Sequence, residues 1–263
     1  MKISRTFVLA AACAALSQSP AFAALLINTD TTGNAIFGTG GNANGGWNLD
    51  SVGSLELGLR AKVRYDSTNQ PQNVFNNNND GTYSHAVGAP TAPVSAANRA
   101  RWNFEWSINS NTNSLGSNLA ATGLVFSLGM DYDPGVGTSY STFNLLGNLT
   151  DSSFGNNTTA ESGGAEAGTL AGYNALAAAN NLVQNSWNLD FFDNGVLYAG
   201  LFNPNVDGNY SFFLQALDAA GNTVARTDIT VIVGAGAVPE PATLALVSLA
   251  LLGAGAASRR RQR

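Results

Sequence analysis

The sequence predicts a mainly β protein whose central part is a single antiparallel β-sandwich. Apolar and polar residues alternate along several segments, and loops rich in Gly, Asn and Ser separate these segments. The central part, residues 24–237, also contains enough Leu, Val, Phe, Tyr and Trp to form a core, and a chain of about 200 residues can bury one without disulfides. No unit of the sequence repeats, which favours one elaborated domain over tandem modules.

Two alternating segments define the expected sheets. In residues 55–65 every second side chain is apolar or small, which predicts a long strand with one buried and one solvated face. Further along, Trp102, Phe104 and Trp106 alternate with polar residues, and aromatic rings in this pattern are expected to face the core. Further strands are expected at residues 124–130 and 196–202, and a further apolar face at residues 187–191.

Two helices are expected in addition to the strands. The first is short and lies near residues 170–183, where the chain is Ala-rich and Leu170, Tyr173 and Leu176 recur near helical spacing. The second is a C-terminal hydrophobic helix over residues 242–257, a stretch without a charge. At 1.5 Å per residue it extends about 24 Å, which is less than the roughly 30 Å hydrocarbon layer of a bilayer. This length suits transient membrane insertion better than permanent anchoring.

The segment before the C-terminal tail predicts a β-hairpin. Two alternating strands within residues 207–233 flank a turn at Gly221 and Asn222. The first strand begins with Asp-Gly-x-Tyr at residues 207–210, which resembles the tyrosine corner of immunoglobulin-like sandwiches. The whole hairpin is similar to the last two strands of many bacterial immunoglobulin-like and fibronectin-like surface domains. This resemblance implies a sandwich of the Ig-like or jelly-roll type.

The N-terminus has the three parts of an export signal in residues 1–23. Lys2 and Arg5 provide a positive start, a short apolar stretch follows, and Ala21 and Ala23 place small residues at the −3 and −1 positions of a cleavage site. We therefore expect export, with cleavage directly after Ala23.

The C-terminus, residues 238–263, has three features in a fixed order. A Pro239-Glu240-Pro241 motif comes first, and its prolines favour extended backbone. The apolar stretch follows, and a basic cluster closes the chain. Arginines at this position favour the cytoplasmic side of a membrane, so the central domain is expected outside. The basic cluster consists of Arg259, Arg260, Arg261 and Arg263.

This ending resembles the PEP-CTERM sorting signal, in which a Pro-Glu-Pro motif precedes a short transmembrane stretch and an arginine cluster. The resemblance implies that an exosortase, a membrane-embedded cysteine protease or transpeptidase, recognises Pro239, Glu240 and Pro241. The family occurs in Gram-negative bacteria that make exopolysaccharide. It therefore implies a destination at the cell surface, in the outer membrane or in the extracellular biofilm matrix. The alternative is an ordinary tail anchor with a chance Pro-Glu-Pro.

Composition excludes several classes of function for residues 24–237. This span has six basic and sixteen acidic side chains, a formal charge of −10, which opposes binding to nucleic acid and to anionic membranes. The only cysteine, Cys13, lies in the export signal, and His85 is the only histidine, so metal sites built on His or Cys clusters are excluded. His85 is expected on a solvated loop, and no G-x-S-x-G motif accompanies it. We therefore expect that the protein is not an enzyme.

Calcium is the only cofactor for which the sequence offers ligands, and the pattern is weak. Asp80 belongs to Asn76-x-Asn78-x-Asp80-Gly81, half of a calcium-loop motif that has Val87 where a bidentate Glu is required. Asp131 and Asp133 bring two more carboxylates to one turn. The alternative, which the pattern favours, is that these side chains form Asx turns with nearby backbone. A lowered thermal midpoint in the presence of chelator would support calcium.

Contact with carbohydrate is a further possibility, because extracellular sandwiches stack sugar rings on exposed aromatic side chains. Trp47 lies in a stretch rich in Gly and Asn and is expected to be exposed, which makes it the candidate for glycan contact. The mature chain has one positive cluster, which could contact acidic polysaccharide, although a solvated strand face is the default interpretation. That cluster consists of Arg60, Lys62 and Arg64.

Three hypotheses for the function follow from these observations. The first is a non-enzymatic cell-surface or matrix protein with a structural or adhesive role. The second is a carbohydrate-binding module for exopolysaccharide. The third is a secreted glycan hydrolase, which would need a deep cleft lined by at least two carboxylates.

Overall fold

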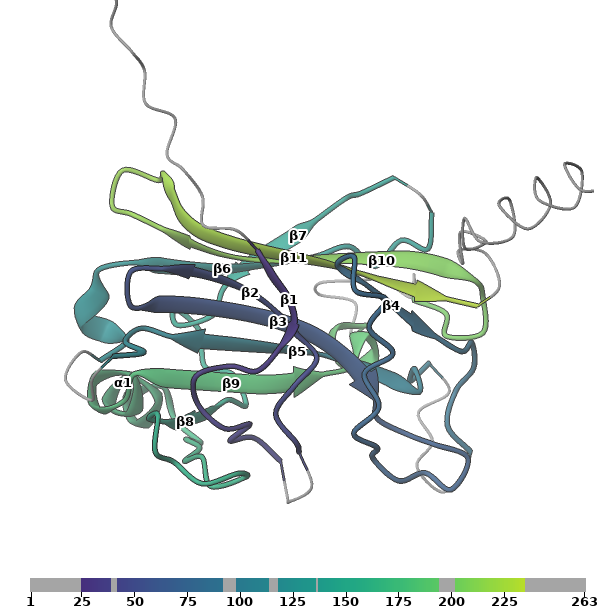
Figure 1. The fold of residues 1–263 in the computed structure, drawn as a ribbon, viewed down its shortest axis with the longest axis horizontal. Coiled ribbons are helices and arrows are strands. Elements are labelled where there is room, and N and C mark those ends of the chain that lie inside the picture. The colour runs from purple at the N-terminus through teal and green to yellow at the C-terminus, as the bar shows by residue number, and fades with distance from the viewer. Residues whose placement is uncertain are drawn as a thin grey trace, which may run out of the picture.

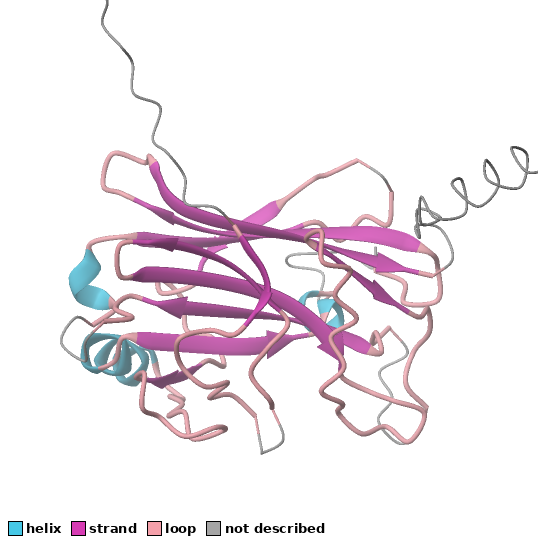
Figure 2. Cartoon of the chain, in the orientation of Figure 1, coloured by secondary structure: helices cyan, strands magenta, loops and turns pink. Residues whose placement is uncertain are grey.

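The computed structural model describes residues 25–38, 42–91, 98–113, 118–135, 137–193 and 202–234. The expected export signal, the hydrophobic helix and the sorting motif lie outside these residues, as does nearly all of the strand expected at 196–202. The described part of the chain is mainly β and contains one α-helix (Figure 2). Within it, no helix has both the length and the apolar character needed to span a bilayer.

Strands make up most of the elements along the chain. The first strands are β1 (Leu26–Thr29), β2 (Trp47–Val52), β3 (Leu55–Val63), β4 (Thr82–His85) and β5 (Trp102–Asn109). After a 3-10 turn at Ala120–Thr122 come β6 (Val125–Met130), β7 (Ser141–Asn144) and β8 (Ser153–Gly155). The remaining elements are α1 (Leu170–Ala179), β9 (Leu182–Trp187), a 3-10 turn at Leu189–Phe192, β10 (Gly208–Leu217) and β11 (Thr223–Val233).

The strands form two sheets on either side of a shared core (Figure 1). The larger sheet has the order β1-β2-β3-β5-β9-β8, and the smaller one has the order β4-β11-β10-β6-β7. All neighbours are antiparallel except β4 and β11, which run parallel. The expectation of a wholly antiparallel sandwich is wrong at this pair. No hairpin joins β4 to β11, so the connection between them does not impose an antiparallel direction.

The core between the sheets is built from alternate residues of the central strands. Trp102, Phe104 and Trp106 all point into it and are 2% exposed or less, which confirms the expected direction of these rings. The ring of Phe104 stacks on that of Phe212 from the opposite sheet, with ring centroids 4.4 Å apart. Aromatic pairs across the core thus hold the two sheets together.

The expected helix is confirmed, but its end is not where the sequence placed it. The helix α1 begins after Thr169, whose hydroxyl accepts a hydrogen bond from the Gly172 amide, and it ends at Ala179. Leu182 and Val183, expected in the helix, instead begin β9 and pair with β5. Tertiary pairing therefore overrides the local Ala-rich preference at this end.

The expected hairpin is confirmed, whereas the tyrosine corner is not. Strands β10 and β11 pair antiparallel along their length, and the Asp218 carboxylate accepts hydrogen bonds from the backbone of the turn between them. Tyr210 is buried against Trp102 and Phe202, but its hydroxyl has no hydrogen-bond partner among the described residues. A tyrosine corner requires that hydroxyl to bind backbone, so Tyr210 serves here as a core residue.

Candidate functional site

The outer face of the larger sheet is polar and largely covered. Its residues include Glu56, Arg60 and Lys62 of β3 and Asn103 and Glu105 of β5, and all of these are buried. The cover is a segment between β1 and β2, residues 30–38 and 42–46, which we call the strap. The expectation that this face of β3 is solvated is therefore wrong.

Side chains of the sheet hold the strap in place. The Glu56 carboxylate accepts hydrogen bonds from the amide and the hydroxyl of Thr32, and burial raises the pKa of this carboxyl despite those bonds. At the far side, the Gln184 side chain accepts from the Ile36 amide at 2.8 Å and donates to the Asn34 carbonyl at 3.1 Å. The strap is thus fastened to β3 and to β9.

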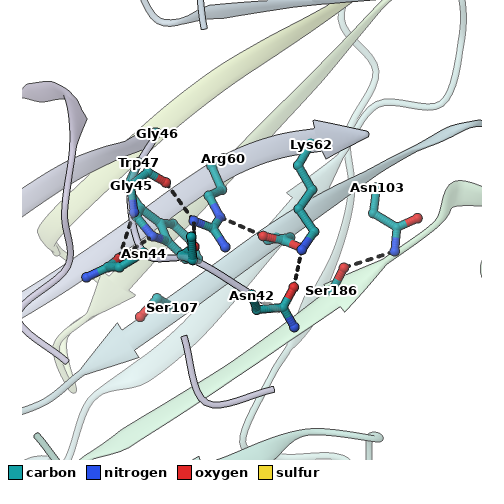
Figure 3. Close-up of polar contacts among 12 residues, drawn as sticks. Asn42, Asn44, Gly45, Gly46, Trp47, Arg60, Lys62, Asn103, Ser107 and Ser186 are labelled. Atoms are coloured by element: carbon teal, nitrogen blue, oxygen red, sulfur yellow. Dashed lines mark hydrogen bonds and ion pairs between the residues drawn. The ribbon is translucent and has the colours of Figure 1, made fainter. Parts of the chain in front are cut away.

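Trp47 is part of this covered layer and does not face solvent. Its relative exposure is 0%, and its indole Nε1 donates a hydrogen bond to Asn44 Oδ1 at 2.9 Å. The guanidinium of Arg60 lies over the Trp47 ring, 4.2 Å from its centroid (Figure 3). The expectation that Trp47 is exposed is therefore wrong, and its ring, covered by the strap and by Arg60, does not offer the free face on which the prediction of glycan contact rested.

The strap closes over Arg60 through two glycines that precede β2. Gly46 has φ +71°, in the left-handed region, and a Cβ at this position would lie 2.5 Å from the Phe75 ring. Gly45 also has a positive φ, and its carbonyl accepts a hydrogen bond from Arg60 Nη1 at 2.6 Å. Any other residue at position 46 would push Phe75 off Arg60, which it covers at 4.5 Å.

Arg60, Lys62 and Glu105 form a buried ion cluster, which we call the charge triad. Arg60 Nε lies 2.6 Å from one Glu105 oxygen, and Lys62 Nζ lies 3.4 Å from the other. Lys62 also donates to Asn42 Oδ1 of the strap (Figure 3). Burial lowers the pKa of Lys62, while the Glu105 carboxylate acts in the opposite direction. Two cations thus share one carboxylate.

A cleft of about 300 Å³ opens beside the charge triad on the same outer face. Lys62 of β3 and Arg64, which directly follows that strand, line one side of the cleft. Asn103 and Ser186 line it from the neighbouring strands β5 and β9. Asn103 Nδ2 donates to the Ser186 hydroxyl at 2.9 Å. The remaining wall carries the carboxylates Asp151 and Glu166, both exposed, and the hydroxyl of Ser153.

Aromatic rings complete the lining of the cleft. Tyr65 is buried, with the Arg64 guanidinium 4.7 Å above its ring, whereas Phe191 is 46% exposed at the opening. Phe191 belongs to the 3-10 turn after β9, where the sequence predicted an apolar face without this role. The cleft therefore offers amides, hydroxyls, charges and an accessible aromatic ring together.

The carboxylates proposed for calcium lie in Asx turns, as the alternative interpretation held. Asp80 Oδ1 accepts from the amide and hydroxyl of Thr82, and Asp133 Oδ1 accepts from the Gly135 amide at 2.9 Å. Asp131 likewise accepts from the amide of Asp133. No group of three carboxylates, His or Cys that could hold a metal occurs in the described part of the chain.

His85 is buried, which overturns the expectation of a solvated loop. It lies on β4, is 6% exposed and stacks on Trp102 with ring centroids 6.0 Å apart. Burial lowers the pKa of its imidazole to about 3. Its Nε2 has no hydrogen-bond partner among the described residues.

The lowered pKa of His85 makes the stability of the domain depend on pH. Below about pH 6.5 the His85 imidazole is protonated in the unfolded chain, whereas in the folded domain it stays neutral until about pH 3. The free energy of unfolding is therefore expected to fall by up to about 1.4 kcal/mol per pH unit in this window on account of His85. Urea unfolding at pH 6.5 and pH 4.5 should show a smaller drop for His85→Phe than for the native chain. An equal drop in the free energy of unfolding for both chains would show that His85 does not cause the pH dependence.

The comparisons with known proteins concern the tail. A family model described as the PEP-CTERM protein-sorting motif matches residues 237–261. The chain is thus an exported, cell-surface-associated protein. More particularly it is a PEP-CTERM protein, a class that exosortase, a membrane protein, processes and sorts. No curated protein and no solved structure matches the chain significantly.

Proposed function

We propose that the exported domain has an adhesive role at the cell surface and binds the saccharide chains of exopolysaccharide in the cleft on its larger sheet. The observation that carries this proposal is the lining of that cleft. Asn103 and Ser186 supply an amide and a hydroxyl, and Phe191 offers an exposed ring at the opening. Saccharides present hydroxyl groups at their edges, which can hydrogen-bond to the amide and the hydroxyl of the cleft. They also present C–H faces, which can pack on the Phe191 ring.

The size and rigidity of the site support a short segment of saccharide as ligand. A volume of about 300 Å³ is at the small end of the range for ligand sites, which runs from about 300 to 1,000 Å³. The floor of the cleft consists of paired strands fixed by the charge triad, so little side-chain entropy is lost on binding. We regard the two sheets as a sandwich that serves as the scaffold, with its destination at the outer membrane or in the extracellular matrix.

We propose binding without turnover. A glycan hydrolase needs two carboxyl groups, one of them kept protonated by apolar surroundings. The cleft does present two carboxylates, Asp151 and Glu166, but both are exposed. Solvated carboxylates of this kind accept hydrogen bonds from sugar hydroxyls, whereas an acid catalyst would sit in a less polar position.

The test is co-sedimentation of the full chain, solubilised in neutral detergent, with exopolysaccharide of its own host. We expect the chain to pellet with the polymer and Phe191→Ala to weaken binding about fivefold, because loss of a stacked ring costs about 1 kcal/mol. Val125→Ala is the matched control, since Val125 is similarly exposed at 42% but lies on β6 of the other sheet.

Two results would contradict the proposal. Failure of the native chain to pellet would rule out exopolysaccharide as the ligand. Release of shorter saccharides during the incubation, abolished in Glu166→Gln, would show turnover and replace adhesion by hydrolysis.

A further inference from the structure

We propose that the cleft selects saccharides that carry a carboxylate, the uronic acid class, and that this carboxylate binds between Lys62 and Arg64. This inference rests on the proposed function and adds the chemical identity of the ligand. It follows from the balance of charges beneath and beside the cleft, from donors that lack acceptors, and from the positions of the charges along the sheet.

The charge triad contains an excess of positive charge. Arg60 and Lys62 are each 1% exposed or less, and Glu105 is the carboxylate within ion-pair distance of both. One buried carboxylate balances one of the two cations. Because a buried charge is costly unless it is paired, an anion placed against Lys62 from the cleft relieves this imbalance.

Two buried hydrogen-bond donors near the site lack acceptors, whereas one buried acceptor there, Glu105 Oε1, lacks a hydrogen-bond donor among the described residues. Arg60 Nη2 and Asn185 Nδ2 are buried, and neither has a hydrogen-bond partner among the described residues. Arg64 also lines the cleft, and no carboxylate in the described part of the chain forms an ion pair with it. A ligand carboxylate only accepts hydrogen bonds, so it suits the unpaired cation and the unpartnered donors on this side of the cleft.

The charges of the cleft are separated across the sheet. Lys62 and Arg64 are at the β3 side, whereas Asp151 precedes β8 and Glu166 accepts a hydrogen bond from Ser153 of β8. β3 and β8 are three strand spacings apart in the sheet order, which is about 14 Å. A ligand with a carboxylate at one end and hydroxyls at the other matches this arrangement, and the reverse orientation is disfavoured by the two carboxylates.

The negative charge of the whole domain does not oppose this local selection. Repulsion between the domain and an acidic polymer acts over the Debye length, which is about 8 Å at physiological ionic strength. Direct pairs with Lys62 and Arg64 form within that distance and are shielded from solvent by the cleft walls. The domain is therefore expected to contact single carboxylates at the site and not to accumulate acidic polymer over its surface.

The test compares ligands that differ only in charge. The full chain in neutral detergent is titrated calorimetrically with oligogalacturonide and oligomannuronate, with the methyl ester of each, and with neutral oligosaccharides. We expect at least one uronate to bind about tenfold or more tightly than its own methyl ester. Arg64→Gln should bring the ratio of the uronate affinity to the ester affinity close to one.

Variants and controls separate this inference from the proposed function. Arg64 is only partly buried, so Arg64→Gln is the main variant, and Lys62→Met serves as a second one once its fold is verified by circular dichroism. Arg226→Gln removes a half-buried arginine of β11 outside the cleft and should leave the ratio of uronate to ester affinity intact. Binding of ester or neutral ligands at least as tight as that of the uronates overturns the carboxylate preference and leaves saccharide binding standing. If no ligand binds and the chain does not pellet with its exopolysaccharide, both proposals are wrong.

Discussion

Replacing Glu105 by glutamine is expected to lower the free energy of unfolding by about 3–5 kcal/mol. Glu105 is fully buried and is the carboxylate that pairs with both Arg60 and Lys62. Glutamine has nearly the same shape, so the change removes charge without creating a cavity. Two cations would then remain buried without a counter-ion, and the strap that rests on them would lose its support. Urea unfolding followed by circular dichroism measures the difference.

Two further variants test whether the unpaired buried cations cause the loss of stability in Glu105→Gln. Asp228→Asn removes the carboxylate of an exposed ion pair with Arg226 and should cost no more than about 1 kcal/mol. Lys62→Met combined with Glu105→Gln should recover part of the loss, because one cation then stays unpaired instead of two. A loss below about 1 kcal/mol for Glu105→Gln, or no recovery in the double variant, would show that the charge triad does not stabilise the fold.

Asn188→Asp is expected to destabilise the domain by about 3 kcal/mol or more. The buried Asn188 amide donates to the carbonyls of Ala100 and Trp102 and to Asn103 Oδ1, with distances between 2.9 and 3.0 Å. Its oxygen accepts from the Ala100 amide. An aspartate would face three oxygens with a negative charge, and each buried acceptor left without a donor costs about 1–3 kcal/mol.

The control for this variant is the same change at an exposed asparagine. Asn203 accepts a hydrogen bond from the Asn205 amide in an exposed turn, and aspartate can accept that bond equally well. Asn203→Asp should shift the free energy of unfolding by no more than about 0.5 kcal/mol. Equal effects at the two positions, measured by urea unfolding, would refute the special role of Asn188.

Much of the fold follows from local sequence patterns. Alternation correctly located β3 and β5 and the rings that face the core, and the hairpin of β10 and β11 was visible from its turn residues. Short strands with polar residues were missed, among them β2, which contains Asn48, Asp50 and Ser51. The apolar-polar alternation of β2 covers only Trp47 to Asp50 and follows a stretch rich in Gly and Asn, so it is too short to stand out as a strand.

The candidate site was less predictable, because distant segments create it. The sequence singled out Arg60, Lys62 and Arg64 as a cluster, but nothing in it indicates that the strap covers two of them. Arg60 lies directly opposite Glu105 in the β3–β5 register, so the ion pair becomes predictable once that register is known. The exposure of Phe191 and the burial of Trp47 depend on tertiary contacts and have no local signal.

The position of β11 in its sheet links completion of the fold to export. β11 is the last strand of the described chain, yet it lies between β4 and β10 and provides one wall of the core. A chain that crosses a membrane from its N-terminus delivers β11 last, immediately before the sorting motif at residues 237–261. The smaller sheet therefore cannot be completed before β11 has crossed, so completion of the fold and delivery of the motif come together at the end of the chain.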